Sequence, residues 1–347
     1  MNHAESTTSA ALLENAVLLE DIVHKVSSCG GILRKHPIQD VYGLLSQTHR
    51  YGTQLPNFGD DAAIVPWQDG YLLMAADGMM TPLLINEPYA AGKAAVMVTV
   101  NDIYAMGGRP IGLVNVLASG DAQQRARIVA GIAKGCQKLQ VPMLGGHTHP
   151  DAAQDHPALS VAILGHAHKL LRSHLAAPGD DLVLAVDLGG RPGCRSVTSW
   201  DANSGKTPAQ LRERLEVMVT IAEREWVVAA KDVSNAGIIG TAAIMAENSG
   251  RGARIDLDAI PRPAGLTLLQ WVLCFQSYGF ILAVPPQNTA RVKNLFEERQ
   301  IAARVIGRVL EQPVVELTLL GHHRTMFDFR KDRITGIRYT PPQDTRS

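Results

Sequence analysis

The sequence predicts an α/β or α+β protein in which helices pack on mixed sheets. Short apolar runs that are typical of strands alternate along the chain with longer segments whose apolar residues recur at helical spacing. This alternation is typical of helices packed on a sheet. The chain has 347 residues and 46% of them are hydrophobic, which is enough for two domains of ordinary size.

In the first half, apolar residues at helical spacing predict a helix over roughly 11–26, and residues 1–10 are small, polar and expected to be frayed. Strands are expected at 61–66 and 71–76, joined by a turn at 68–70. The β-branched residues of 96–103 favour a strand by propensity. Further along, the sequence predicts a strand at 111–117, a helix at 121–139, a buried strand at 141–144 and a strand at 159–164.

In the second half, Thr207 and Gln210 form a capping box with Pro208 between them, which predicts a helix that extends to about 226. A helix at 238–248 is expected to end at Gly250. Four strands and two more helices are expected, with the strands at 182–186, 253–257, 280–284 and 303–310 and the helices at 264–274 and 288–299.

The composition argues against several classes of protein. Lys plus Arg and Asp plus Glu both number 33, whereas nucleic-acid binders need a basic surface. The four cysteines show no paired spacing, so we expect neither a disulfide framework nor a zinc ribbon, and a reducing cytoplasm fits. No long uncharged apolar run predicts a membrane span.

Acidic residues interrupt sequence that otherwise has the character of a core. Asp60 and Asp61 precede a run of apolar residues, Asp77 ends another, and Asp102 follows Asn101 in a third. A buried carboxylate without a partner is costly, so such residues normally have a cation beside them. The pattern indicates a hard metal ion that carries an anionic ligand, most simply Mg²⁺ with a nucleotide.

The spacing of these motifs resembles the AIR synthase-like superfamily, which includes AIR synthetase, formylglycinamidine ribonucleotide synthetase, thiamine-monophosphate kinase, selenophosphate synthetase and a hydrogenase maturation protein. The residues that carry the resemblance are Gly59–Ala63, Asp77-Gly78, Asp102–Pro110, Gly145–Thr148 and Lys231–Gly237. The match extends from about 55 to about 310.

The resemblance implies an N-terminal mixed-sheet domain that dimerises and binds ATP with Mg²⁺, followed by a C-terminal α/β domain. It also implies a buried helix over 96–103, against the local propensity. We expect a helical extension at 1–50, the two domains at 51–174 and 175–312, and a tail at 313–347.

The resemblance further implies roles for particular residues. The expected metal ligands are Asp60, Asp61, Asp77, Asp102 and Asp232. Asp77, Asp232 and His147 are the expected catalytic residues, and the nucleotide would also contact Asp60, Asp61, Asn101, Asp102, Gly145, Gly146 and Thr148. Asp232 has an alternative interpretation as an ion-pair partner of Lys231.

Two other features have alternative interpretations. Cys29–Lys35 loosely resembles the reactive glycine-rich loop of selenophosphate synthetases, although a helix end followed by a loop is the preferred interpretation. Two His-x-His pairs, His147 with His149 and His166 with His168, could instead form a transition-metal site.

The predicted function is ATP- and Mg²⁺-dependent transfer of a phosphoryl group to a small-molecule acceptor, or activation of that acceptor, by a cytoplasmic homodimer. Chemistry like that of thiamine-monophosphate kinase ranks first, because such a transfer needs only the carboxylates. Chemistry like that of selenophosphate synthetase or AIR synthase is the first alternative. A non-catalytic nucleotide-binding homologue is the second.

Overall fold

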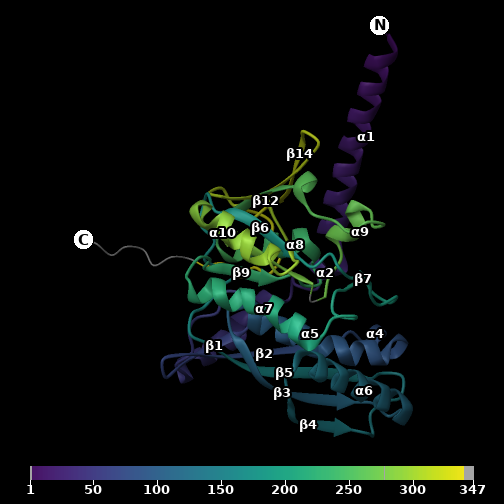
Figure 1. Cartoon of the computed structure of the whole chain (residues 1–347), viewed down its shortest axis with the longest axis vertical. Coiled ribbons are helices and arrows are strands. Elements are labelled where there is room, and N and C mark those ends of the chain that lie inside the picture. The colour runs from purple at the N-terminus through teal and green to yellow at the C-terminus, as the bar shows by residue number, and fades with distance from the viewer. Residues whose placement is uncertain (1, 277, 340–347) are drawn as a thin grey trace, which may run out of the picture.

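A computed structural model describes the backbone of residues 2–276 and 278–339 and the side chains from residue 14 onward. Two large sheets organise the chain, one formed by its first half and one by its second (Figure 1). Among the helices of the described residues, none is both long and apolar enough to span a lipid bilayer.

The first sheet has five strands in the order β1-β2-β5-β3-β4. These are β1 (Ala63–Trp67), β2 (Gly70–Gly78), β3 (Arg109–Ala118), β4 (Met143–His149) and β5 (Ala158–Ala167). The β3–β4 pair is parallel and the other pairs are antiparallel, so the sheet is mixed, as predicted. Three helices lie on one face of it in Figure 1, namely α4 (Thr81–Asn86), α5 (Pro88–Ala105) and α6 (Ala122–Leu139).

The second sheet has seven strands in the order β14-β13-β10-β12-β6-β11-β9. These are β6 (Asp181–Val186), β9 (Ala229–Asp232), β10 (Gly252–Asp256), β11 (Gly279–Val284), β12 (Ala302–Leu310), β13 (Val314–Leu319) and β14 (His322–Asp328). β13 and β14 lie within residues 313–347, which we expected to be a tail. They are integral to the sheet, because β13 pairs with β10.

Helices cover both faces of the second sheet. Residues of α7 (Pro208–Glu223) and α10 (Pro286–Glu297) share one hydrophobic cluster with α5 and the first sheet. Residues of α1 (Asn2–Ser27), α8 (Gly237–Asn248) and α9 (Leu268–Val272) pack in a second cluster on the opposite face. Alternate residues of β6 enter the two clusters, with Val183 in one and Leu184 in the other, as the period of two in a strand requires.

The conflict over 96–103 is resolved in favour of a helix, because α5 is buried along most of its length. Glycines allow α5 and α6 to approach closely. A Cβ on Gly92 would lie 2.1 Å from the carbonyl oxygen of Ile128, and one on Gly131 would lie 2.1 Å from that of Tyr89. Tertiary packing therefore overrides the β propensity of this segment.

Several predicted elements differ from the structure. α1 begins at Asn2 rather than near residue 11, and α9 spans only Leu268–Val272. The loop expected after Gly30 is instead helical, because α2 (Gly30–Leu33) and then α3 (Ile38–Leu45) follow α1. The 3₁₀ turn Ser46–Tyr51 ends this segment. The predicted buried strand at 141–144 is instead the edge strand β4, and its residues from Leu144 to His149 are exposed. A short hairpin of β7 (Arg191–Pro192) and β8 (Trp200–Asp201) and a 3₁₀ turn at Leu257–Ala259 complete the described elements.

Candidate functional site

A pocket of about 700 Å³ lies where the N-terminal segment, the first sheet and the second sheet meet. This volume falls within the range of about 300–1,000 Å³ that is typical of small-molecule sites. The wall formed by α3 contributes the apolar side chains of Ile38, Val41 and Leu45, whereas the opposite end of the pocket is acidic. The pocket therefore combines an apolar region with a strongly charged one.

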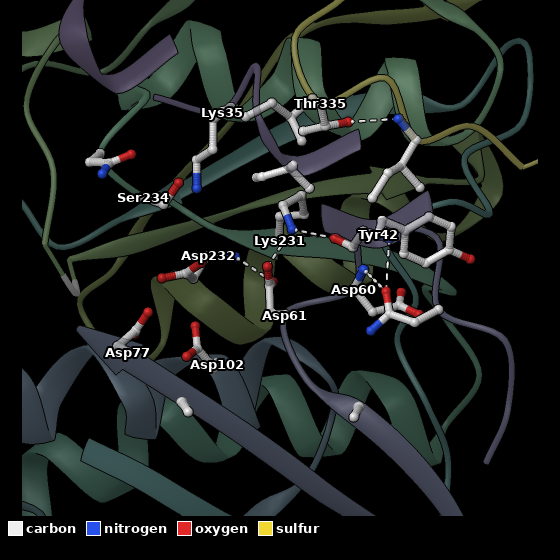
Figure 2. Close-up of a pocket in the computed structure, with 18 of the residues that line it drawn as sticks. Lys35, Tyr42, Asp60, Asp61, Asp77, Asp102, Lys231, Asp232, Ser234 and Thr335 are labelled. Carbon is white, nitrogen blue, oxygen red and sulfur yellow. Dashed lines mark hydrogen bonds and ion pairs between the residues drawn. The ribbon is translucent and has the colours of Figure 1, made fainter. Parts of the chain in front are cut away.

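Four carboxylates from four separate segments converge on the acidic end (Figure 2). Asp61 lies in the loop before β1, Asp77 lies in β2, Asp102 lies in the last turn of α5 and Asp232 ends β9. Figure 2 shows Asp77 and Asp102 on one side of the pocket, with Asp61 and Asp232 facing them.

These carboxylates destabilise one another's charge. Burial raises the pKa of Asp102 well above its ordinary value, and the charges of the other three carboxylates add to this effect. Burial also raises the pKa of Asp77 and of Asp232, with a contribution from Asp61 in both cases. Buried like charges behave in this way when the positive charge beside them does not suffice to neutralise them.

Two lysines supply part of the opposing charge. Burial opposes the charge of Lys231, but Asp61, with which it forms an ion pair, outweighs burial and raises the pKa of the amine. The Lys231 amine also donates to the Gly59 carbonyl at 2.9 Å. Lys35 points into the pocket from above the carboxylates (Figure 2), and burial, together with the charge of Lys231, lowers its pKa.

Lys35 is a site residue that the sequence motifs did not identify. It follows α2, and Gly31 in that helix packs so closely on the β9–α8 loop that a Cβ would lie 1.9 Å from the Asn235 carbonyl oxygen. This contact brings the N-terminal segment over the carboxylates. The loose glycine-rich pattern at Cys29–Lys35 was the available signal, but a helix end was the preferred interpretation of it.

Asp60 also lines the pocket, but its carboxylate already has partners within the protein. Its carboxylate accepts hydrogen bonds from the Arg172 Nε at 2.9 Å and from the Ser173 backbone N–H at 2.7 Å. Burial would raise the pKa of Asp60, but His174, Arg172 and the Ser173 N–H outweigh it and lower the pKa to about 2. These contacts occupy the carboxylate, and we infer that Asp60 fixes the loop that carries Asp61.

Asn101 departs from its predicted place. Its side chain is buried and lines a small cavity on the side of α5 that faces the second sheet, together with Ala185 and Phe280. Successive residues of a helix project about 100° apart, and Asn101 and Asp102 here line two different cavities. Only Asp102 lines the acidic pocket.

Gly145, Gly146, His147 and Thr148 lie on β4, exposed and outside the pocket. β5 and β3 separate β4 from β2 in the sheet, so β4 lies roughly 14 Å from Asp77 at the usual strand spacing. These four residues therefore do not line the pocket in which the carboxylates converge, and their predicted contact with a nucleotide stays a prediction. The glycine-rich motif marks an edge strand whose location could not be derived from local sequence.

Comparisons with known proteins identify both halves of the chain. Residues 59–167 match the model of the AIR synthase related protein, N-terminal domain, and residues 178–319 match the model of the C-terminal domain. An uncharacterized protein from Synechocystis is 40% identical over 322 residues, which cover 92% of this chain and 99% of that protein.

Solved structures share the fold. PurL from Thermotoga maritima complexed with ADP superposes with a TM-score of 0.69 at 20% identity, over 86% of this chain and 51% of that one. AaThiL complexed with AMPPCP and TMP superposes with a TM-score of 0.62 at 19% identity, over 83% of this chain and 96% of that one. This chain therefore spans about half the length of the PurL chain, and the predicted two-domain α/β fold is confirmed.

Proposed function

The chain belongs to the family of AIR synthase related proteins, and we propose that it uses ATP and Mg²⁺ to phosphorylate or activate a small molecule. The observation that carries this proposal is the convergence of Asp61, Asp77, Asp102 and Asp232 in one pocket. Solved relatives with this fold hold ADP or AMPPCP, and a nucleotide is therefore the ligand we assign to the pocket.

The donor set fits Mg²⁺. Four carboxylates face two ammonium groups, Lys35 and Lys231, and if all six are ionised the formal balance is −4 + 2 = −2, which one divalent cation offsets. In the described residues the carboxylates do not close into a cage made of protein alone. This suits Mg²⁺, which usually keeps several waters and binds one or two carboxylates together with substrate phosphates. Mg²⁺ would supply neutralisation of the charge that develops on the phosphate oxygens.

We assign separate roles to the residues around that ion. Asp77 and Asp102 would hold it from the first sheet and α5, and Asp232 would hold it from the second sheet. Lys231 holds Asp61 in place through the ion pair. The lowered pKa of Lys35, caused first by burial, makes its ammonium easier to deprotonate than an exposed one, and a phosphate beside it would restore the charge.

The apolar wall of the pocket suits the base and ribose of the nucleotide. Ile38, Val41 and Leu45 project from α3, and Ile337 approaches from the C-terminal segment. An apolar surface with a charged region at its far end matches the shape of a nucleotide, which has a flat apolar base and an anionic tail. The acceptor would bind beyond the terminal phosphate, close to Lys35 and Ser234.

Simple phosphoryl transfer is the first choice of reaction, because it requires positioning and cations and no protein nucleophile. An ATP-dependent synthetase is the first alternative, and a non-catalytic nucleotide-binding protein is the second alternative. The products distinguish them. The purified protein should release ADP from MgATP in the presence of a suitable acceptor, tested with thiamine monophosphate, selenide, thiocarboxamides and aminoimidazole precursors. ADP together with a phosphorylated acceptor would indicate simple transfer, whereas ADP with inorganic phosphate and no phosphorylated acceptor, or AMP, would indicate synthetase chemistry. Nucleotide binding without turnover on any acceptor would contradict an enzymatic role.

We also propose that the protein is a homodimer that associates through the open face of the first sheet. That face exposes large apolar side chains, namely Met74, Ile111, Val114, Val116 and Leu144, each between 45% and 66% exposed. Soluble monomers rarely expose a contiguous apolar surface of this kind. The helices α4, α5 and α6 cover the other face, so a partner has only this face to cover.

A further inference from the structure

A second cluster of ligand-type side chains lies at the far end of the first sheet, outside the pocket. Asp69, His166 and His168 each offer one ligand atom, and these atoms all lie within 4.8 Å of one another. The His168 Nδ1 is 3.8 Å from an Asp69 carboxylate oxygen, and the two imidazole centroids are 4.8 Å apart with their planes at 83°.

The fold fixes this arrangement through strand register. Asp69 lies in the turn between β1 and β2, where Gln68 adopts a φ of 51°. β5 runs antiparallel to β2, and its residue His166 is paired with Leu72. The end of β5 therefore lies beside that turn, so residues about 100 positions apart in the sequence meet at one edge of the molecule.

Gly70 makes room for the cluster. A Cβ at this position would lie 2.7 Å from the His166 Nε2 and 2.5 Å from the Ala167 carbonyl oxygen. The absence of a side chain at Gly70 thus lets the His166 ring lie against the turn that carries Asp69. Any larger residue would push the imidazole away from its two neighbours.

We propose that Asp69, His166 and His168 bind a divalent transition-metal ion, with Zn²⁺ the best match. Two imidazoles and one carboxylate are the donors that zinc takes, at about 2.0–2.2 Å, whereas Mg²⁺ prefers oxygen alone. A tetrahedral ion separates its ligand atoms by about 3.3 Å. The exposed side chains of Asp69 and His168, at 80% and 52%, are free to rotate over the remaining distance.

The metal would tie the β1–β2 turn to the end of β5. The chain leaves the first sheet at this point, and Lys169, the residue after His168, pairs with Glu225 beyond α7 at 3.0 Å. A metal clip here would stabilise the first sheet close to its junction with the second half of the chain. Three protein ligands also leave one coordination position for water or an exogenous ligand.

Zinc titration of the full-length, metal-stripped protein tests the proposal, with millimolar Mg²⁺ present to occupy the carboxylate pocket. Calorimetry should detect one zinc ion per chain, and Co²⁺ should give the visible absorption of a low-symmetry four-coordinate site. His168→Ala and Asp69→Asn should each weaken zinc binding by at least about tenfold, and zinc should raise the melting temperature of the wild-type protein but not of these variants.

His156→Ala is the matched control, because His156 forms an exposed pair with Asp155 at 2.9 Å and lies outside the cluster. It should bind zinc as the wild type does. Absence of zinc binding at micromolar concentration would overturn the proposal, as would equal zinc affinity in His168→Ala, Asp69→Asn and wild type. Neither result depends on nucleotide binding, so the proposed function is tested separately.

Discussion

Replacing Asp60 with Asn should destabilise the fold while leaving the nucleotide site largely intact. The Asp60 side chain is fully buried, and the Arg172 Nη2 lies 2.8 Å from its carboxylate. The pKa of Asp60 is lowered from 3.8 to about 2. Each unit of such a pKa difference is worth about 1.4 kcal/mol, so the ionised carboxylate contributes about 2.5 kcal/mol to the free energy of unfolding.

The sign of the pH dependence follows from the direction of that shift. A lowered pKa means that the unfolded chain binds the proton more readily, so the contribution is present above about pH 4 and is lost as the pH falls towards 2. Urea unfolding should show Asp60→Asn to be less stable than wild type by about 2.5 kcal/mol at pH 7. The difference in stability between Asp60→Asn and wild type should become smaller as the pH falls below about 4.

The matched control for this experiment is Asp155→Asn, because Asp155 is 80% exposed and its ion pair lies in solvent. Surface pairs contribute little, so this change should leave the free energy of unfolding unchanged within the error of the measurement. If Asp60→Asn were as stable as wild type, or if it folded normally yet lost Mg²⁺-dependent nucleotide binding, the structural role that we assign to Asp60 would be refuted.

Three further predictions concern packing, assembly and the pocket. Gly131→Ala should lower the free energy of unfolding by about 2 kcal/mol or more, because the added Cβ would lie 2.1 Å from the Tyr89 carbonyl oxygen. A Cβ at Gly145 would have nothing within 4 Å, so Gly145→Ala should be tolerated. Equal melting temperatures of the two variants would contradict the packing argument. Val116→Asp should convert the dimer into a monomer, as measured by light scattering. Val129 is exposed on α6, and Val129→Asp should remain a dimer. If both variants were dimers, the interface would lie elsewhere. Lys35→Met should reduce turnover by about 100-fold with an unchanged melting temperature. Lys25 is half-exposed on α1, so Lys25→Met should retain full turnover. Normal turnover in Lys35→Met would show that Lys35 is not part of the site.

The sequence was most informative where a function depends on residues inside regular elements. Asp77, Asp102 and Asp232 end or interrupt apolar segments, and acids in such places need a reason to be buried. The alternation of strands and helices was likewise readable from short-range pattern, and α5 was recovered only because the family resemblance outweighed its β-branched composition.

The sequence was least informative where long-range packing decides which way a side chain or a segment faces. Asp60 and Asp61 are adjacent and chemically identical, and their roles differ because Asp60 pairs with Arg172 whereas Asp61 pairs with Lys231, both more than one hundred positions away. Lys35 reaches the pocket through the contact of Gly31 with the Asn235 carbonyl, a long-range contact that the glycine-rich pattern at Cys29–Lys35 does not specify. The motif at Gly145–Thr148 was visible, but the position of β4 at the sheet edge depends on the pairing order of the strands.

The most direct test of the central claim is calorimetric titration of the protein with ATP, with and without Mg²⁺. The convergence of carboxylates predicts saturable binding of ATP that requires Mg²⁺, and Asp102→Asn should weaken this binding by at least about 30-fold. Asp151 is exposed and lies outside the pocket, so Asp151→Asn should bind MgATP as wild type does. If wild type bound ATP equally well with Mg²⁺ removed by EDTA, or if Asp102→Asn bound MgATP with unchanged affinity, the carboxylates would not be holding a metal–nucleotide complex.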